Sequence, residues 1–252
     1  MTRPVTLITG ASAGLGAEFA RQCAARGEAL VLAARRRDRL EALKAQIGGD
    51  IHVTAADLSE AGAAESLMAQ IAAEGLFVET LINNAGFGGG GPFARQPLER
   101  QREMIDLNVR TLTELCHLAL GPMLERGQGA ILNVASTAAF QPGPGSAVYF
   151  ATKAYVLSFT EALHQELKGS RIKVSALCPG PTATEFGEVA GYTGPALERF
   201  KADALGVVKA GLDGLDRNHA IVIPGFANKA GAQASRFLPR SAVRRIIASL
   251  RF

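Results

Sequence analysis

The chain has little of what marks a secreted, metal-binding or membrane-spanning protein. Only three cysteines occur among its 252 residues, and no two share a Cys-x-x-Cys spacing. We therefore expect reduced, buried thiols in a cytoplasmic protein. The four histidines show no metal-ligand spacing, so we predict neither a structural nor a catalytic zinc.

Long hydrophobic runs and large aromatic side chains are also scarce. No run of about eighteen apolar residues occurs, which excludes a membrane-spanning helix, and a strand follows Met1 too closely to leave room for a signal peptide. Tryptophan is absent, and aromatic residues make up 6% of the chain. The residues that are present, 48% hydrophobic with 28 glycines, predict a sizeable core in which helices lie close to a sheet.

Acidic side chains are missing from one end of the chain. Residues 229–252, the basic tail, carry six basic side chains and no acid, whereas the rest carries 21 basic and 23 acidic side chains. The net charge of +4 therefore lies in the tail, which argues against a nucleic-acid surface. Val243, Ile246, Ile247 and Leu250 share one helix face. We expect this stripe to pack on the protein's own core or on a subunit, with attachment to an anionic membrane surface as the alternative.

Short apolar strands alternate with helical stretches along the chain. The expected strands are Val5–Thr9, Ala29–Ala34, Ile51–Ala55, Thr80–Asn83, Ala130–Ala135, Ile172–Leu177 and Ala220–Ile223. The expected helices are Ala17–Arg26, Arg37–Ile47, Ala61–Glu74, Leu98–Arg126 and Ser146–Lys168. This order predicts one α/β domain over residues 1–252, doubly wound and Rossmann-type, with about seven parallel strands and helices on both faces. Residues 181–205 are the expected substrate-loop region, with a mobile lid over 181–200.

The first strand leads into a glycine-rich turn. Gly10, Gly14 and Gly16 separate it from a good helix former, an arrangement that directs free backbone N–H groups at an anion. Gly10 permits the tight turn, Gly14 permits a close backbone approach, and Gly16 permits close packing of helix on strand. The spacing differs from the Gly-x-Gly-x-x-Gly dinucleotide fingerprint, so a glycine turn that binds nothing is the alternative.

Two arginines follow the second strand, about twenty residues past the glycine turn. An acid at this place would bind the ribose 2′-hydroxyl of NAD, whereas an arginine matches the 2′-phosphate of NADP. No acid occurs between Glu28 and Asp38. We predict Arg35 as the first phosphate contact and Arg36 as its helper, against the alternative of a solvated helix start.

Further motifs follow in a fixed order. They are Thr9-Gly10-x-x-x-Gly14-x-Gly16, Asn83-Asn-Ala-Gly86, Ser136, Tyr149-x-x-x-Lys153 and Pro179-Gly180. In this order and spacing, over roughly residues 5–225, the chain resembles the short-chain dehydrogenase/reductase superfamily.

Tyr149 and Lys153 lie four residues apart and so share one helix face. Carbonyl reduction needs a proton donor, and a phenol is a weak one near neutral pH unless a neighbouring ammonium lowers its pKa. Neither Tyr155 nor Tyr192 has a lysine four residues later. A packing tyrosine beside a lysine that extends to solvent is the alternative.

Two further catalytic residues complete the tetrad that the resemblance implies. Ser136 directly follows the fifth strand, where its hydroxyl could hold the substrate oxygen; a turn serine is the alternative, and Thr137 is a rival for the role. Asn108 is a poor helix former inside an expected helix, and a satisfied buried amide is its alternative. The resemblance implies a structural and proton-relay role for it beside Lys153. The tetrad is then Asn108, Ser136, Tyr149 and Lys153.

The resemblance also implies the cofactor contacts. Asp57 and Leu58 match the adenine contact, the Asn83–Gly86 turn supports the central strand and the nicotinamide ribose, and Thr182 is the expected donor to the carboxamide. The expected cofactor-binding residues are Gly10, Ser12, Gly14, Leu15, Gly16, Arg35, Arg36, Asp57, Leu58, Asn84, Ala85, Gly86, Tyr149, Lys153, Pro179, Gly180 and Thr182.

Two features depart from the family pattern. Members that prefer NADP often have a basic residue just before the second glycine, where this chain has Ala13, so the NADP(H) prediction rests on Arg35 and Arg36. Gly88–Gly91 is unusually rich in glycine; we expect a flexible loop at the mouth of the site and assign it no contact.

The sequence thus predicts an oxidoreductase that interconverts a carbonyl and a secondary alcohol with NADP(H), NAD(H) being less favoured. The expected substrate is a hydrophobic ketone or a 3-oxoacyl-like compound, while a steroid-like ring or a sugar stays open. Some aromatic residues lie in segments that could line an apolar pocket, with ordinary core positions as the equal alternative: Phe87, Phe93, Phe140, Phe186, Tyr192 and Phe200.

Two other functions are weighed against this one. A sugar-nucleotide epimerase or dehydratase shares the Tyr/Lys pair, but residues 205–252 are too short for its substrate domain. A non-catalytic NADP(H) sensor or scaffold would bind without turnover, and the intact tetrad argues against it. The resemblance implies a homodimer or homotetramer through the helices near 98–126 and 146–168.

Overall fold

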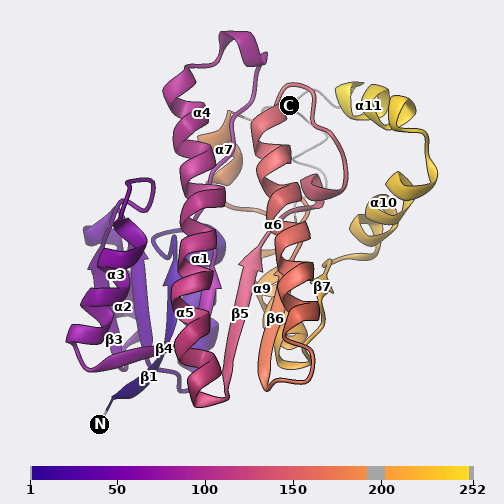
Figure 1. Cartoon of the computed structure of the whole chain (residues 1–252). Coiled ribbons are helices and arrows are strands. Elements are labelled where there is room, and N and C mark those ends of the chain that lie inside the picture. Colours follow the sequence, from indigo (N-terminus) through magenta and orange to yellow (C-terminus); the bar gives the residue numbers. More distant parts are fainter. Residues whose placement is uncertain (1, 192–201, 250–252) are drawn as a thin grey trace.

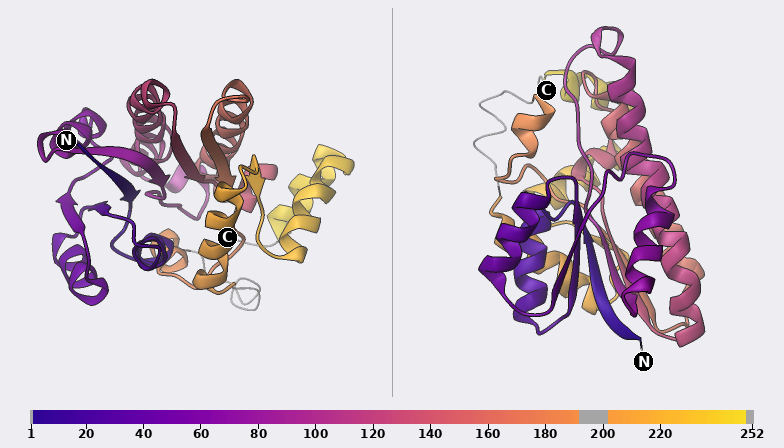
Figure 2. Two further views of the ribbon diagram at one scale, coloured as in Figure 1. Left: turned by 90° about the horizontal axis from the view of Figure 1, so that it is seen from below. Right: turned by 90° about the vertical axis from the view of Figure 1, so that its left-hand side faces the viewer.

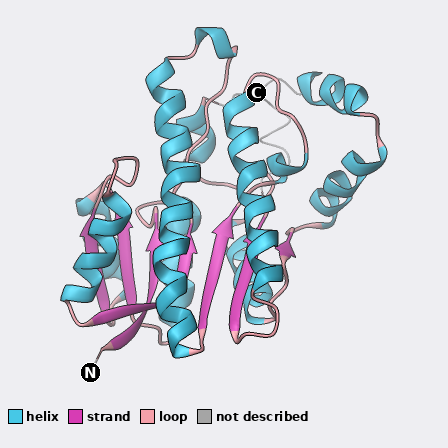
Figure 3. Ribbon diagram, in the orientation of Figure 1, coloured by secondary structure: helices cyan, strands magenta, loops and turns pink. Residues whose placement is uncertain are grey.

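The computed structural model describes residues 2–191 and 202–249 (Figure 1). Within these residues seven strands form one sheet in the order β3-β2-β1-β4-β5-β6-β7, and every neighbouring pair is parallel (Figure 3). The strands are β1 (Arg3–Thr9), β2 (Leu30–Ala34), β3 (Ile51–Ala55), β4 (Leu76–Asn83), β5 (Gly129–Val134), β6 (Ile172–Leu177) and β7 (Ile221–Val222). The order reverses between β1 and β4, which opens a crevice at their carboxyl ends.

Helices cover both faces of the sheet, as Figure 2 shows. On one face lie α3 (Ala63–Ala73), α5 (Leu112–Arg126) and α6 (Ala147–Glu166), and on the other lie α1 (Gly14–Ala25), α2 (Arg37–Ile47) and α9 (Ala204–Asp216). Successive strand residues alternate between these two cores: Leu7 and Leu81 belong to the first, Ile8 and Ile82 to the second. The sequence prediction of a doubly wound, Rossmann-type single domain is confirmed.

The expected helix Leu98–Arg126 is interrupted. It consists of α4 (Leu98–Ile105), a π-helical segment η2 (Asp106–Thr111) and α5. π turns arise where one residue too many is accommodated in a helix, and they are frequent at functional sites. Asn108 lies in this segment and is buried.

Helix α9 is not predicted by the sequence pattern, because Gly206, Gly211 and Gly214 are weak helix formers. The structure gives the reason for two of them. A Cβ on Gly214 would overlap the side chain of Val222, and one on Gly211 would come within 2.9 Å of Leu177. The glycines let the helix lie directly on β6 and β7.

The remaining elements lie above the carboxyl edge of the sheet or beside β7. They are η1 (Phe93–Arg95), η3 (Thr137–Phe140), α7 (Phe186–Ala190), α10 (Phe226–Phe237) and α11 (Arg240–Ser249). Residues 181–191 of the expected substrate loop include α7, and Thr182 pairs with Ala202 in an isolated bridge. The rest of the expected lid, 192–201, lies outside the described residues.

The basic tail folds back on the domain. Val243 and Ile247 are buried in an apolar cluster with Phe87, Met104 and Tyr149, so the prediction that the tail stripe packs on the protein's own core is confirmed for them. Ile246 is 51% exposed and does not pack on the core, so packing on a subunit stays a prediction for this residue. Leu250 lies outside the described residues.

Among the described residues, the cysteine and histidine side chains form neither a disulfide nor a metal site. Cys23, Cys116 and Cys178 are buried and unpaired, and burial raises the pKa of each thiol. Across residues 2–191 and 202–249, no three His, Cys, Asp or Glu side chains gather as a metal site requires. No helix in these ranges is long and apolar enough to cross a membrane.

Candidate active site

A cleft of about 680 Å³ opens at the carboxyl edge of the sheet. It gathers residues that are far apart in the sequence, from the ends of β1, β2, β4, β5 and β6 and from α6. Every expected site residue lines it except Gly16 and Asn108, which lie directly behind it. The lining residues among them are Gly10, Ser12, Gly14, Leu15, Arg35, Arg36, Asp57, Leu58, Asn84, Ala85, Gly86, Ser136, Tyr149, Lys153, Pro179, Gly180 and Thr182.

The glycine turn requires its glycines. Gly10 and Gly14 have φ values of 66° and 55°, which side-chain-bearing residues rarely adopt. A Cβ on Gly16 would overlap the carbonyl oxygen of Gly10, and a Cβ on Gly10 would lie 2.8 Å from the Cα of Ala85. Among the described residues no side chain caps the start of α1, so its first N–H groups remain available to an anion such as a pyrophosphate.

Thr9 and Asn84 join the ends of β1 and β4. The Thr9 hydroxyl oxygen accepts hydrogen bonds from the backbone N–H groups of Asn84 (3.1 Å) and Ala85 (3.0 Å). In return the Asn84 amide donates to the Thr9 carbonyl oxygen at 2.9 Å. Thr9 is therefore a positioning residue that the expected site set omits, although it stands in the motif directly before Gly10.

The expected phosphate-binding arginines stand at the entrance to the cleft. Arg36 donates to the Ser12 hydroxyl at 3.2 Å and pairs with Glu185 at 3.5 Å, while the guanidinium of Arg35 lies 3.8 Å from the carboxylate of Asp57. Arg39, one turn further along α2, holds Glu185 at 2.7 Å, and this hydrogen bond lowers the pKa of the Glu185 carboxyl. The sequence does not predict Arg39 or Glu185 as site residues, because the two residues that pair with each other lie 146 positions apart in the chain.

This group of exposed cations fits the 2′-phosphate of NADP(H). Arg35 and Arg36 border the cleft, and their present carboxylate partners bind them loosely at 3.8 and 3.5 Å. A dianionic phosphate is a stronger acceptor for a guanidinium than a single distant carboxylate. The uncapped N-terminus of α1 supplies the matching place for the pyrophosphate.

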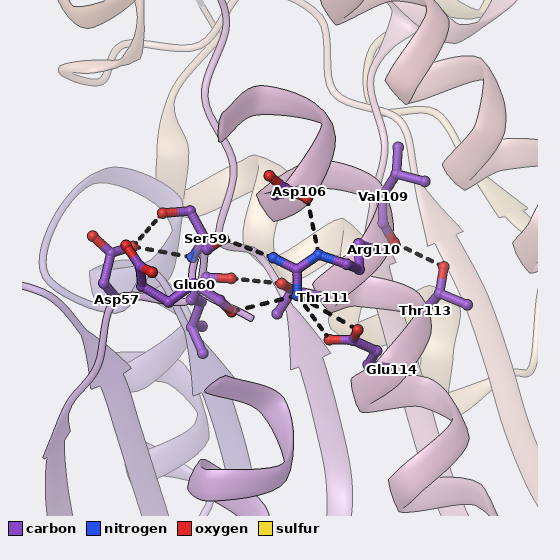
Figure 4. Close-up of polar contacts among 10 residues, drawn as sticks. Asp57, Ser59, Glu60, Asp106, Val109, Arg110, Thr111, Thr113 and Glu114 are labelled. Carbon is purple, nitrogen blue, oxygen red and sulfur yellow. Dashed lines mark hydrogen bonds and ion pairs between the residues drawn. The ribbon is translucent and has the colours of Figure 1, made fainter. Parts of the chain in front are cut away.

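Arg110 fastens the loop that carries Asp57 and Leu58 (Figure 4). Its guanidinium donates to the Ser59 carbonyl oxygen at 2.7 Å and pairs with Asp106 at 2.9 Å. Ser59 in turn donates its backbone N–H and its hydroxyl to Asp57, at 3.0 and 2.6 Å. The π-helical segment thus fixes the expected adenine contact.

Tyr149 and Lys153 project from α6 into the cleft. Lys153 is buried and donates to the Val134 carbonyl oxygen at 2.7 Å, with its Nζ 5.9 Å from the centre of the Tyr149 ring. Burial lowers the pKa of the Lys153 ammonium to about 8. The Tyr149 ring packs on Phe150 and Phe186, with centroids 6.0 and 5.5 Å away.

Asn108 is fully engaged by its neighbours. Its amide donates to the Phe87 carbonyl oxygen (3.0 Å) and to the Thr152 hydroxyl (3.1 Å), and its oxygen accepts from the Phe87 N–H (3.2 Å). A Cβ on Gly86 would come within 2.9 Å of that oxygen and 3.5 Å of Lys153 Nζ. These contacts are those of a satisfied buried amide, and they hold the Asn83–Gly86 turn against α6.

Ser136 begins the helical turn η3. Its hydroxyl oxygen accepts from the Ala138 N–H at 3.1 Å, and no described residue accepts its proton. Its neighbour Thr137 also lines the cleft and donates its backbone N–H to the Pro179 carbonyl oxygen at 2.9 Å. The Thr182 hydroxyl donates to the Gly180 carbonyl oxygen at 3.0 Å, so the Pro179–Thr182 segment is held in place beside Ser136.

The Gly88–Gly91 loop, to which the sequence gives no contact, is held by hydrogen bonds to described residues, one of them from the Gln96 amide to the Gly90 carbonyl oxygen at 2.7 Å. The Ser146 hydroxyl donates to the Gly89 carbonyl oxygen at 2.8 Å, and the Gly90 N–H donates to Ala190 at the end of α7 at 2.9 Å. The Gly91 N–H donates to the Gly145 carbonyl oxygen at 2.7 Å. The loop therefore connects α7 to the start of α6.

One end of the cleft is apolar. We call Phe87, Leu107, Ala138, Phe150, Phe186 and Ile247 the apolar wall. Of the aromatic residues, Phe87 and Phe186 belong to it, whereas Phe140 packs on the sheet core, which is the alternative for these residues. Phe93 is 61% exposed and does neither. Tyr192 and Phe200 lie outside the described residues. The sequence did not place Ile247 or Asn228 of the tail at the cleft, yet both line it.

Comparisons with known proteins agree with this geometry. The family model for short chain dehydrogenase matches residues 4–191. The chain is 34% identical to the NADP-dependent 3-hydroxy acid dehydrogenase YdfG of Escherichia coli strain K12 over 201 residues, which are 79% of this chain and 77% of the relative.

Two solved structures have the same fold. One is a short-chain dehydrogenase from Sphingobium yanoikuyae in complex with NADPH, with a TM-score of 0.81, 34% identity, and coverage of 93% of this chain and 94% of that one. The other is the bulky-bulky ketone specific alcohol dehydrogenase from Comamonas testosteroni, with a TM-score of 0.77, 30% identity, and coverage of 94% and 93%.

Proposed function

The chain belongs to the short-chain dehydrogenase family, and on that premise we propose that it is an NADPH-dependent reductase of a bulky, uncharged ketone. The wider class is an oxidoreductase that interconverts a carbonyl and an alcohol with NADP(H). The direction of the reaction and the kind of ketone are the proposed refinements.

The composition of the apolar wall carries the proposal. Its six residues are all hydrophobic. Among the described residues, Glu103 also lines this end of the cleft, and its carboxylate pairs with Arg100 at 3.5 Å. The relative named for 3-hydroxy acids acts on anions, and a buried anion requires a cation. The described cations nearest the cleft are engaged elsewhere. Lys153 donates to Val134, and Arg35 and Arg36 lie at the cofactor end. Arg100 lies over the outer side of the Phe87 ring at 3.8 Å, pairs with Glu103 and does not line the cleft.

Each residue of the tetrad then has a task that its contacts support. Tyr149 gives a proton to the carbonyl oxygen, and Ser136 donates its free hydroxyl proton to the same oxygen. The Lys153 ammonium beside the Tyr149 ring favours the phenolate and so makes the phenol a better acid. Asn108 positions the Phe87 segment, which forms part of the wall. When bound, NADPH supplies the hydride.

A carbonyl panel tests the proposal. We expect NADPH oxidation with benzophenone and other bulky ketones. For substrates that carry an anionic group, kcat/KM should be at least tenfold lower; the panel contains sulfoacetaldehyde for reduction, and serine and 3-hydroxypropionate for the reverse, oxidative direction. The apolar wall excludes the charged group because its desolvation is uncompensated. Equal or greater activity on the anionic compounds would contradict the assigned substrate class while leaving the reductase chemistry intact.

Ile247 sets the size of the substrate site. We expect Ile247→Ala to shift the ratio of kcat/KM for benzophenone over acetophenone upward several-fold, because the removed side chain enlarges the apolar end of the cleft. Val243→Ala is the matched control: Val243 lies one turn earlier in the same cluster but does not line the cleft. Both changes lower the melting temperature, and only the first changes the ratio.

We also propose that the protein is cytoplasmic and forms a homodimer or homotetramer. Buried, unpaired thiols suit a reducing compartment. Ile105 of α4, Leu124 of α5 and Tyr155 of α6 are exposed on the two long helical stretches, where a second copy would cover them.

A further inference from the structure

Helix α10 presents two phenylalanines to solvent. Phe226 and Phe237 are 88% and 85% exposed, more than any other large hydrophobic residue described. They are separated by three turns of the helix, about 16 Å along its axis and about 20° around it, so they lie on one side. The opposite side faces the domain, because Ala232 is buried and the Asn228 side chain lies against Gly180 and lines the cleft.

Five cations accompany these rings. They are Lys229, Arg236, Arg240, Arg244 and Arg245, all exposed. No aspartate or glutamate follows Asp216 in the sequence. Within the described part of the chain none of the five forms an ion pair or a side-chain hydrogen bond, whereas every arginine from Arg3 to Arg39 is in an ion pair.

The two helices lie at one end of the molecule. Figure 1 and the left view of Figure 2 place α10 and α11 beyond β7, at the opposite end of the sheet from β3. Leu238, between the helices, and Ile246 of α11 are also partly exposed. The exposed side chains of α10 and α11, with Leu238 between them, therefore combine apolar groups with positive charge that is unpaired among the described residues. We call them the tail surface: Phe226, Phe237, Leu238, Ile246, Lys229, Arg236, Arg240, Arg244 and Arg245.

We propose that the tail surface docks on an anionic phospholipid membrane. Lipid phosphates neutralise the five unpaired cations, and the boundary between headgroups and acyl chains accepts the two phenylalanine rings. An acidic soluble partner would satisfy the cations alone. The helices lie on the membrane and do not enter it further, because their inner sides are buried in the domain through Ala232, Val243 and Ile247.

The tail surface adjoins the cleft. Asn228 of α10 and Ile247 of α11 line the cleft from the inner sides of the helices whose outer sides bear the proposed membrane contact. An apolar ketone that partitions into lipid is thereby concentrated near the apolar wall. The docking proposal rests on the surface residues and stands or falls independently of the substrate class.

Vesicle sedimentation of the full chain tests this. We expect binding to vesicles of phosphatidylcholine with one third phosphatidylglycerol, weak binding to phosphatidylcholine alone, and release by concentrated salt. Lys229→Gln with Arg236→Gln, and separately Phe226→Ser with Phe237→Ser, should each lower the partition coefficient by roughly tenfold or more. Melting temperature and NADPH affinity stay unchanged, since these side chains contact neither core nor cleft.

The controls and contrary outcomes are distinct. Phe93→Ser with Arg95→Gln removes an exposed phenylalanine and an exposed, unpaired arginine from η1, and should leave binding unchanged. Equal binding to neutral and anionic vesicles, or no loss in either tail variant, would overturn the proposal. So would a fall in the solution mass by light scattering in the phenylalanine variant, since the tail surface would then be a contact between copies.

Discussion

Tyr149→Phe should lower kcat/KM for ketone reduction by about 10³-fold while NADPH still binds with nearly the wild-type dissociation constant. The ring and its packing on Phe150 and Phe186 remain, and the phenolic hydroxyl, which carries the proton, is removed. Steady-state NADPH oxidation gives the first quantity, and quenching of protein fluorescence by NADPH gives the second.

Tyr155→Phe is the control for this change. Tyr155 lies on the same helix, six residues later, but its hydroxyl shares a hydrogen bond with Thr113 at 2.9 Å and it does not line the cleft. Its variant should keep full activity. Turnover retained in Tyr149→Phe would refute the proton-donor role, and loss of NADPH binding would mean that the hydroxyl serves the cofactor.

Replacing both Arg35 and Arg36 by alanine should weaken NADPH binding roughly 30- to 100-fold and leave NADH binding nearly unchanged. Charge-assisted hydrogen bonds contribute about 1.5–3 kcal/mol each, and solvent screening of these exposed groups reduces the sum for the pair to about 2–2.7 kcal/mol, which corresponds to this change in affinity. Fluorescence titration with each nucleotide measures the two dissociation constants side by side.

Arg37→Ala is the matched control for the arginine pair. Arg37 is the next residue in the same basic run, but it pairs with Glu41 at 3.7 Å and does not line the cleft. We expect it to retain wild-type NADPH affinity. An unchanged preference for NADPH in the double variant would show that another group binds the phosphate, Arg39 being the nearest cation.

The sequence is sufficient for the sheet and much of the cleft because these depend on local patterns. Apolar β-branched runs mark the strands, and the glycine turn carries its steric reason within a few residues: Gly16 must lack a side chain because the Gly10 carbonyl lies against it. Tyr149 and Lys153 meet because four residues make about one helical turn. Such features need no knowledge of distant contacts.

Other features depend on contacts that no local pattern encodes. Helix α9 forms because Gly211 and Gly214 can lie against β6 and β7, which overrides their poor helix propensity. The π-helical segment at Asn108 is stabilised from outside by the Ser59 carbonyl oxygen, which accepts a hydrogen bond from Arg110 of the segment. Ile247 reaches the cleft only because the tail folds back over the domain. These are tertiary effects, and the structure is needed to see them.

Deuterium transfer from labelled NADPH tests the account most directly. The wild-type protein is incubated with benzophenone and with NADPH that carries deuterium at both positions of the hydride-donating carbon, and the alcohol is analysed by mass spectrometry. We predict an alcohol with one deuterium on the carbinol carbon, and about 10³-fold less of it in a reaction with Tyr149→Phe under the same conditions. NADPH that binds but transfers no deuterium to any ketone of the panel would contradict the reductase function itself.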